Sequence, residues 1–158
     1  MERIVGISEY VVSSDPDDTL VTYALGSCVG LTLHDAVAGV AGMLHAMMPA
    51  SMTNTEKAAE TPAMYVDTGT LAMLQELFNL GATRANIVAK VAGAASPIDK
   101  DKMFRIGDRN YMVLRKVLWK NGILIAAEDV GGIASRSVYL DVGTGQTLVK
   151  SEGAVSEL

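Results

Sequence analysis

The segment Leu20–Pro49, LVTYALGSCVGLTLHDAVAGVAGMLHAMMP, alternates short apolar runs with joints that contain glycine. Apolar, β-branched runs of this length between turn residues are typical of β-strands. We predict strands over Leu20–Leu25, Val29–His34 and Val40–Met48. The last two form a hairpin that turns at Asp35–Gly39. Strands that follow one another directly favour a core rich in β-sheet over a parallel βαβ array.

Two segments further along the chain have helical periodicity. Apolar residues within Leu71–Phe78 fall on one face, and Gly81 is the expected end of that helix. A second helix has Asp108 as its expected N-cap and ends at Gly122. Further strands are expected over Arg3–Val12, Asn86–Ala95, Ile123–Ala127, Arg136–Val142 and Gln146–Lys150. The predicted fold class is α/β, with one domain over residues 1–158, a mixed or antiparallel sheet and two main helices.

The segment Ala50–Ala63, ASMTNTEKAAETPA, is small, polar and charged, unlike the apolar runs before it. Loops longer than about 12 residues are uncommon in compact domains and are often functional. We therefore expect a functional lid or a docking element there.

The composition excludes several classes of protein. The chain has 158 residues, 49% of them hydrophobic and 20% charged, which suits one globular domain. A net charge of −5 with scattered basic residues and few aromatic ones argues against nucleic-acid binding, which needs a concentrated basic face. No apolar stretch approaches the roughly 18–20 residues of a membrane-spanning helix, and Met1–Val12 lacks the pattern of a signal peptide. Since one cysteine cannot form an internal disulfide, we expect a cytoplasmic location without membrane insertion.

Cys28, the lone cysteine, directly follows Gly26 and Ser27 at the joint between two predicted strands. A thiol at such a bend is exposed, and backbone N–H groups around Gly26 and Ser27 can point toward a developing oxyanion. The alternative is a buried structural thiol, which is the commoner role of a lone cysteine. The tight Gly-Ser turn favours a nucleophile.

His45 is the candidate base, because the second strand of the predicted hairpin returns it to a place beside Cys28. The alternative is a core histidine with satisfied hydrogen bonds. His34, the other histidine, lies at the turn beside Asp35 and is expected to be solvated. An imidazole beside a thiol can take its proton, and the resulting thiolate–imidazolium pair lowers the pKa of the thiol.

A thiol enzyme of the acyl-transfer type also needs a group that orients the imidazole. Four candidates remain open, namely Thr22, Ser27, Asp67 and Asp129. Other chemistries have less support: no cluster of Cys, His, Asp or Glu has the spacing of a metal site, and the glycine-rich pieces lack the context of a phosphate or dinucleotide loop. We expect no metal and no cofactor.

Two motifs, LGSCVG at Leu25–Gly30 and LHAMMP at Leu44–Pro49, resemble the signature segments of CheD, the chemoreceptor glutamine deamidase family. Further blocks resemble the family in the same order along nearly the whole chain: GISEYVV (Gly6–Val12), MYVDTG (Met64–Gly69), VAGAAS (Val91–Ser96), IGDRN (Ile106–Asn110) and AEDVGGIASRSV (Ala127–Val138). Three positions depart from the commonest pattern: Met48, Ala94, where a second glycine is usual, and Val130, where threonine is usual.

The resemblance implies an α/β sandwich related to bacterial toxin deamidases with a Cys–His pair. It implies a catalytic triad in which Cys28 is the nucleophile, His45 the base and Thr22 the group that orients the histidine. The implied reaction converts receptor glutamines to glutamates with release of ammonia, and the cytoplasmic helices of chemoreceptors are the implied substrate. As an alternative, the resemblance implies a module that binds and regulates a CheC-type phosphatase, with or without catalysis.

Overall fold

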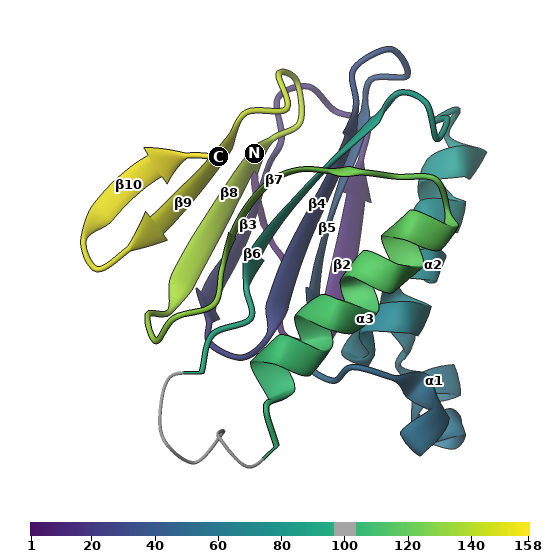
Figure 1. Cartoon of the computed structure of the whole chain (residues 1–158). Helices are drawn as coiled ribbons and strands as arrows, with labels where there is room; N and C mark the ends of the chain where they lie inside the picture. Colours follow the sequence, from purple (N-terminus) through teal and green to yellow (C-terminus); the bar gives the residue numbers. More distant parts are fainter. Residues whose placement is uncertain (97–103) are drawn as a thin grey trace.

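The computed structural model describes residues 1–96 and 104–158, and it places two five-stranded β-sheets face to face (Figure 1). The first sheet has the strand order β1-β3-β8-β9-β10 and the second has the order β2-β5-β4-β6-β7. The strands are β1 (Glu2–Ile4), β2 (Glu9–Ser13), β3 (Thr19–Leu25), β4 (Val29–Asp35), β5 (Val40–Ala46), β6 (Ile87–Gly93), β7 (Ile125–Val130), β8 (Arg136–Asp141), β9 (Thr147–Ser151) and β10 (Ala154–Glu157). The helices are η1 (Ser51–Thr53), α1 (Thr55–Glu60), η2 (Pro62–Met64), α2 (Val66–Asn79) and α3 (Ile106–Lys120).

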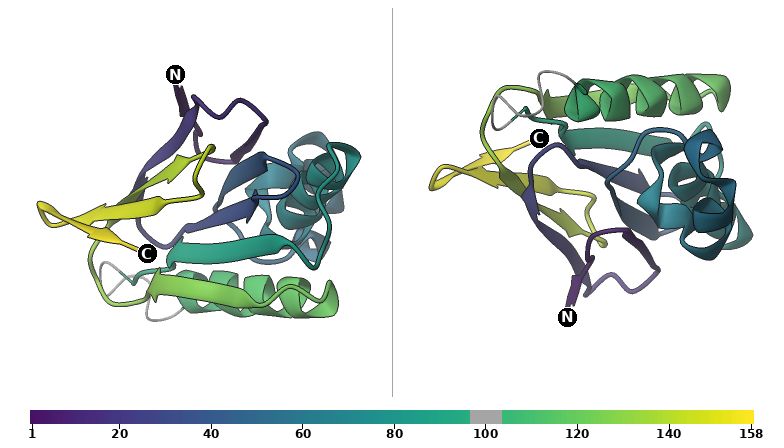
Figure 2. Two further views of the ribbon diagram at one scale, coloured as in Figure 1. Left: turned by 90° about the horizontal axis from the view of Figure 1, so that it is seen from above. Right: turned by 90° about the horizontal axis from the view of Figure 1, so that it is seen from below.

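Two apolar layers hold the sheets and helices together. One lies between the sheets, where Leu20 and Leu140 of the first sheet pack with Met43 of the second. The other lies on the far face of the second sheet, where Leu31 packs with Leu114 of α3. Figure 2 shows α2 and α3 on the side of the second sheet away from β8–β10. The expected α/β sandwich is confirmed, with two sheets in place of one, and both are mixed because the β1–β3 and β6–β7 pairs are parallel.

The β4–β5 hairpin has the pairing that its sequence predicts. Val29 pairs with Ala46 and Asp35 pairs with Val40, so the turn lies at residues 36–39. Every residue of both strands is buried, because the first sheet covers one face and the helices cover the other. Strands covered on both faces have nearly continuous apolar sequences, which is the pattern seen here.

The prediction of a single strand over Arg3–Val12 is wrong. The chain leaves β1 after Ile4 and enters β2 at Glu9, and the two strands belong to different sheets. Ser8 has a φ of 62° at this crossing, which ends the extended run. Local β-propensity does not indicate which sheet a residue joins, so the sequence could not reveal the crossing.

The polar segment Ala50–Ala63 is not an open loop. It contains η1 and α1 and leads into η2, and Asn54 caps α1 by accepting a hydrogen bond from the backbone N–H of Lys57. Asp67 of α2 ties this segment down, because its carboxylate accepts hydrogen bonds from the backbone N–H and the hydroxyl of Ser51. Each helical turn here is too short to give a periodic pattern in the sequence.

The helices differ from the prediction chiefly at the start of α3. Arg105, in the left-handed conformation, occupies the N-cap position that we expected for Asp108. Asp108 lies instead in the first turn, where its negative charge suits the positive end of the helix dipole. Helix α2 ends at Asn79 and is followed by Gly81 at a φ of +100°, as its sequence predicts. No helix within residues 1–96 and 104–158 is long and apolar enough to cross a membrane.

The C-terminal strands follow the predicted hairpin and add one strand. β8 and β9 pair antiparallel as expected, whereas the sequence does not predict β10, which pairs with β9. All residues of β10 are exposed, so they lack the alternation by which a half-buried strand is found in a sequence.

The end of β6 approaches the turn before β4 very closely. Gly93 has a φ of +100°, and a Cβ there would lie 2.4 Å from the carbonyl oxygen of Cys28. Ala94 follows with a φ of 52°. Left-handed backbone costs a residue with a Cβ about 1–2 kcal/mol. This strain accounts for the preference for glycine at position 94 that the resemblance indicates.

We expect Ala94→Gly to lower the free energy of unfolding much less than an ordinary buried Ala→Gly substitution. Relief of the left-handed backbone offsets the lost methyl contacts and the greater flexibility of the unfolded chain. Ala89→Gly is the matched control, because Ala89 is also buried but lies within β6 and has no positive φ. In urea unfolding the Ala94 variant should be more stable than the Ala89 variant by about 1–2 kcal/mol. Equal losses would contradict the strain at Ala94.

Candidate active site

The turn that bears Cys28 begins at a bulge in β3. The register of β3 with β8 shifts between Thr22 and Leu25, and Ala24 within that shift has a φ of 56°. Bulges end strand pairing and re-aim the chain. Here the chain leaves the first sheet and enters β4 of the second, with Cys28 directly before β4. Thr22 therefore lies on the first sheet, and Cys28 lies in the turn that leads to the second.

The β4–β5 register places His45 diagonally across from the end of the turn that bears Cys28. Gly30 is the direct partner of His45, and Cys28 precedes Gly30 by two residues. Such diagonal positions in an antiparallel pair are about 7–8 Å apart, which is within reach of long side chains. Cys28 packs against the layer between the sheets. His45 lies two residues after Met43 on β5, so both side chains face this layer. Within the described residues no hydrogen bond joins the Cys28 thiol to the His45 imidazole, whose Nε2 has no partner.

Thr22 connects the two sheets through a hydrogen bond to His45. Its Oγ1 lies 2.7 Å from Nδ1 of His45 and 2.7 Å from the carbonyl oxygen of Val5. Thr22 is fully buried and His45 is 1% exposed, so water does not weaken these contacts. Of the four groups that the sequence left open, Thr22 is the one that the structure brings to the imidazole.

The carbonyl of Val5 determines how the protons are arranged in this chain of hydrogen bonds. A carbonyl oxygen only accepts, so the single hydroxyl proton of Thr22 is donated to Val5. Thr22 Oγ1 therefore accepts a hydrogen bond from Nδ1–H of His45. In a neutral imidazole the other nitrogen then has a free lone pair. Nε2 of His45 is buried without a hydrogen-bond partner among the described residues, as a general base requires.

Burial favours the neutral forms of both Cys28 and His45. Desolvation raises the pKa of the Cys28 thiol, against a smaller lowering by its own backbone N–H. Desolvation also lowers the pKa of His45. Each shift disfavours the charged form of its group, so desolvation works against a thiolate–imidazolium pair. The sequence does not show this desolvation, which comes from the burial of His45 and the partial burial of Cys28.

The carbonyl groups of residues 26–28 are each held by a hydrogen bond. The carbonyl of Gly26 accepts from the backbone N–H of Ala95 at 2.9 Å, and that of Cys28 accepts from the backbone N–H of Ala94 at 2.8 Å. The middle one, that of Ser27, accepts from Nδ2 of Asn110 on α3 at 2.9 Å. The turn is therefore fixed from two directions. Our sequence analysis missed Asn110, although an amide within the apolar repeat of the second helix was a visible signal.

The other titratable candidates have partners of their own. Asp67 accepts hydrogen bonds at the start of α2, and Asp129 forms an ion pair with Arg136 at 3.2 Å. His34 is buried rather than solvated, because the β8–β9 turn folds over its ring and its Nε2 lies 3.1 Å from the carbonyl oxygen of Val142. In the parts of the chain that the structure describes, no three His, Cys, Asp or Glu side chains gather to hold a metal ion.

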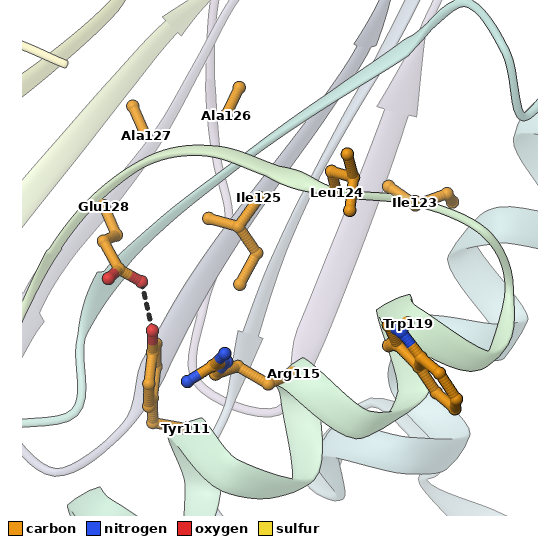
Figure 3. A pocket seen from close by; sticks show the side chains of 9 residues that line it. All are labelled: Tyr111, Arg115, Trp119, Ile123, Leu124, Ile125, Ala126, Ala127 and Glu128. Atoms are coloured by element: carbon orange, nitrogen blue, oxygen red, sulfur yellow. Dashed lines mark hydrogen bonds between the residues drawn. The ribbon is translucent and has the colours of Figure 1, made fainter.

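A separate groove of about 530 Å³ lies between α3 and β7 (Figure 3). Tyr111, Arg115 and Trp119 line it from α3, and residues 123–128 form its other side. The hydroxyl of Tyr111 donates a hydrogen bond to the carboxylate of Glu128 across it. None of the three predicted catalytic residues, all of which lie in the described ranges, lines this groove. The groove is therefore distinct from the Cys–His–Thr site.

Comparison with known proteins agrees with the resemblance seen in the sequence. The family model for CheD, described as CheD chemotactic sensory transduction, matches residues 47–151. The probable chemoreceptor glutamine deamidase CheD of Solibacter usitatus is 44% identical over 159 residues, covering 100% of this chain and 94% of the relative. The chemoreceptor glutamine deamidase CheD of Thermotoga maritima is 39% identical over 158 residues, covering 100% of this chain and 97% of the relative. Among solved structures, the hypothetical protein YfiH of Bacillus licheniformis is similar over 77% of this chain and 49% of its own, with 17% identity and a TM-score of 0.49. By its family match and its relatives, this chain belongs to the CheD family.

Proposed function

We propose that this chain is a protein-glutamine deamidase that acts on the cytoplasmic helices of chemoreceptors. It converts specific glutamine side chains to glutamates and releases ammonia. The names of its relatives, which are chemoreceptor glutamine deamidases, support the substrate and the reaction. The observation that best supports catalysis is the buried, unpartnered Nε2 of His45, whose lone pair follows from the hydrogen bonds of Thr22 and Val5.

In the first half of the reaction, Sγ of Cys28 attacks the side-chain carbonyl carbon of a glutamine. The thiol proton passes to Nε2 of His45 as the S–C bond forms. The carbonyl oxygen becomes an oxyanion, which backbone N–H groups around Gly26 and Ser27 stabilise. His45 then donates its proton to the nitrogen of the amide, the C–N bond breaks, and ammonia leaves. The product of this half is a thioester.

In the second half, water attacks the thioester carbon while Nε2 of His45 takes a proton from it. The C–S bond breaks, the thiol of Cys28 regains its proton, and the glutamate side chain is released. Thr22 acts through His45 in both halves, because its hydroxyl oxygen keeps Nδ1 protonated and Nε2 facing the reaction. Thr22 is thus a positioning residue.

A regulatory role, in which the protein binds a CheC-type phosphatase, is the second function that the family resemblance implies. Binding of a partner does not require a buried threonine, a tautomer fixed by two hydrogen bonds, or a buried imidazole nitrogen that has no partner among the described residues. These features favour catalysis as the main function. Phosphatase binding remains a prediction. The two roles could share one surface.

We expect Cys28→Ser to lower the rate of ammonia release from purified receptor fragments by more than about 10³-fold, because the hydroxyl is a far weaker nucleophile than the thiol. Mass spectrometry of receptors co-expressed with each variant locates the glutamines that become glutamates. Thermal unfolding of the variant shows that it remains folded. Wild-type activity in the folded variant would rule out this mechanism.

We expect Thr22→Val to lower kcat by about 10²-fold or more, because Nδ1 of His45 loses its acceptor and the ring loses its preferred tautomer. Thr22→Ser keeps the hydroxyl and should restore most of the rate. Thr70→Val is the matched control, since Thr70 is also fully buried but its hydroxyl has no partner among the described residues. If the control loses as much activity as Thr22→Val, the effect is one of packing and not of the imidazole.

The acid limb of kcat/KM should lie below pH 6.5, the usual pKa of a histidine. Burial lowers the pKa of His45, and only the neutral ring accepts the thiol proton. Activity is therefore retained as the pH falls to 6.5 and is lost as the pH falls through the lower pKa of the folded protein. Rates of ammonia release between about pH 5 and 8 measure this limb. A limb above 6.5 would instead indicate an imidazolium stabilised by a thiolate.

A further inference from the structure

Helix α3 presents one amide side chain to the interior of the protein. Its buried positions are Gly107, Asn110, Leu114 and Leu118, which follow the helical repeat. Asn110 is fully buried at a position of this repeat where an apolar residue would suit the core. Burial of an amide is unfavourable unless its polar groups are hydrogen-bonded. The partners of Asn110 therefore indicate why an amide stands there.

The Asn110 carboxamide binds two backbone carbonyls from segments that are far apart in the sequence. Its Nδ2 lies 2.9 Å from the carbonyl oxygen of Ser27 and 3.2 Å from that of Met47. Ser27 directly precedes Cys28, and Met47 lies two residues after His45. One side chain thus joins the segment that bears the nucleophile to the segment that bears the base.

The β4–β5 ladder does not hold these two carbonyls. Ser27 lies before the start of β4 and Met47 lies beyond the end of β5. Helix α3 approaches the segment after β6 closely at Gly107, where a Cβ would lie 2.4 Å from the carbonyl oxygen of Ala95, and this approach brings Asn110 near both carbonyls. The two hydrogen bonds of Asn110 therefore depend on the close approach of α3.

The remaining polar atom of Asn110 is left without a partner. Oδ1 is buried and accepts no hydrogen bond from any described residue. An unsatisfied buried acceptor is destabilising, and an apolar side chain would avoid this cost. An amide that is satisfied at its nitrogen alone is present for its two donors and not for a net gain in stability.

We propose that Asn110 is a positioning residue for deamidation: by holding the backbone at Ser27 and Met47, its carboxamide sets the separation of Cys28 and His45. This inference rests on the proposed function and adds a residue that lies outside the two signature motifs. Cys28 and His45 have no hydrogen bond to each other, so their relative placement depends on the backbone that bears them. A misplacement of about 1 Å between reacting groups can lower a rate by about 10²-fold.

Two substitutions remove the donors in different ways. Asn110→Ala removes the whole carboxamide, whereas Asn110→Asp removes both N–H groups and keeps the shape and volume. We expect either variant to lower kcat for ammonia release from receptor fragments by about 10- to 100-fold, with KM changed by less than about 2-fold.

Asn121→Ala is the matched control. Asn121 lies at the other end of α3, and its Nδ2 also donates to a backbone carbonyl, that of Val117, at 2.8 Å. This variant loses the same kind of hydrogen bond from the same helix, far from the Cys28 turn. We expect its kcat to equal that of the wild type.

Alkylation of Cys28 by iodoacetamide gives a second readout that needs no receptor. In the wild-type background, His45→Ala should slow alkylation, because the imidazole assists removal of the thiol proton. In the Asn110→Asp background the slowing caused by His45→Ala should shrink toward none, because the base no longer sits at the right distance. A purely structural role of Asn110 would leave this ratio of rates unchanged.

The outcomes separate the inference from the function on which it rests. A kcat within about 2-fold of the wild type in a folded Asn110 variant would overturn the inference. So would an undiminished effect of His45→Ala on alkylation, or loss of cooperative unfolding in both Asn110 variants. If the wild-type protein releases no ammonia, the proposed function fails, and the alkylation ratio still decides whether Asn110 positions the pair.

Discussion

The hydrogen bond between Thr22 and His45 is the interaction on which the site depends, because it joins the two sheets. Thr22 belongs to β3 of the first sheet and His45 to β5 of the second. The carbonyl of Val5 gives this contact a direction by accepting the hydroxyl proton. The segment that follows Val5 also reaches His45, since the backbone N–H of Ser8 donates to its carbonyl oxygen at 2.9 Å. The crossing from β1 to β2 thus braces both ends of the contact.

Burial shifts the pKa values of the two titratable side chains of the site. Burial raises the pKa of the Cys28 thiol and lowers that of the His45 imidazole, so it favours the neutral form of each group. In the proposed reaction, charge would develop inside a layer of low dielectric constant, where fixed hydrogen bonds act strongly. A neutral imidazole with a protonated Nδ1 is ready to accept a proton without first releasing one.

Close backbone packing holds the Cys28 turn in place. Gly93 and Gly107 allow β6 and α3 to approach at distances that a Cβ would prevent. As a result the carbonyls of residues 26–28 all find donors, two from the backbone and one from Asn110. A turn held in this way has few other conformations, which is the condition for a nucleophile and an oxyanion site that need no rearrangement.

The sequence by itself determined the β4–β5 hairpin, the positions of the two long helices and the family. Hairpin register follows from an alternation of period two and a nearby turn, both of which are local. Only the tertiary structure showed the hydrogen bond from His45 to Thr22, brought in Asn110 and divided the first strand between two sheets. Thr22 itself was already implied by the family resemblance. The hydrogen bond between Thr22 and His45 joins two sheets across 23 positions of the sequence. The one from Asn110 to Ser27 joins a helix to a turn across 83 positions. They depend on how the layers stack, and no local pattern in the chain reports that.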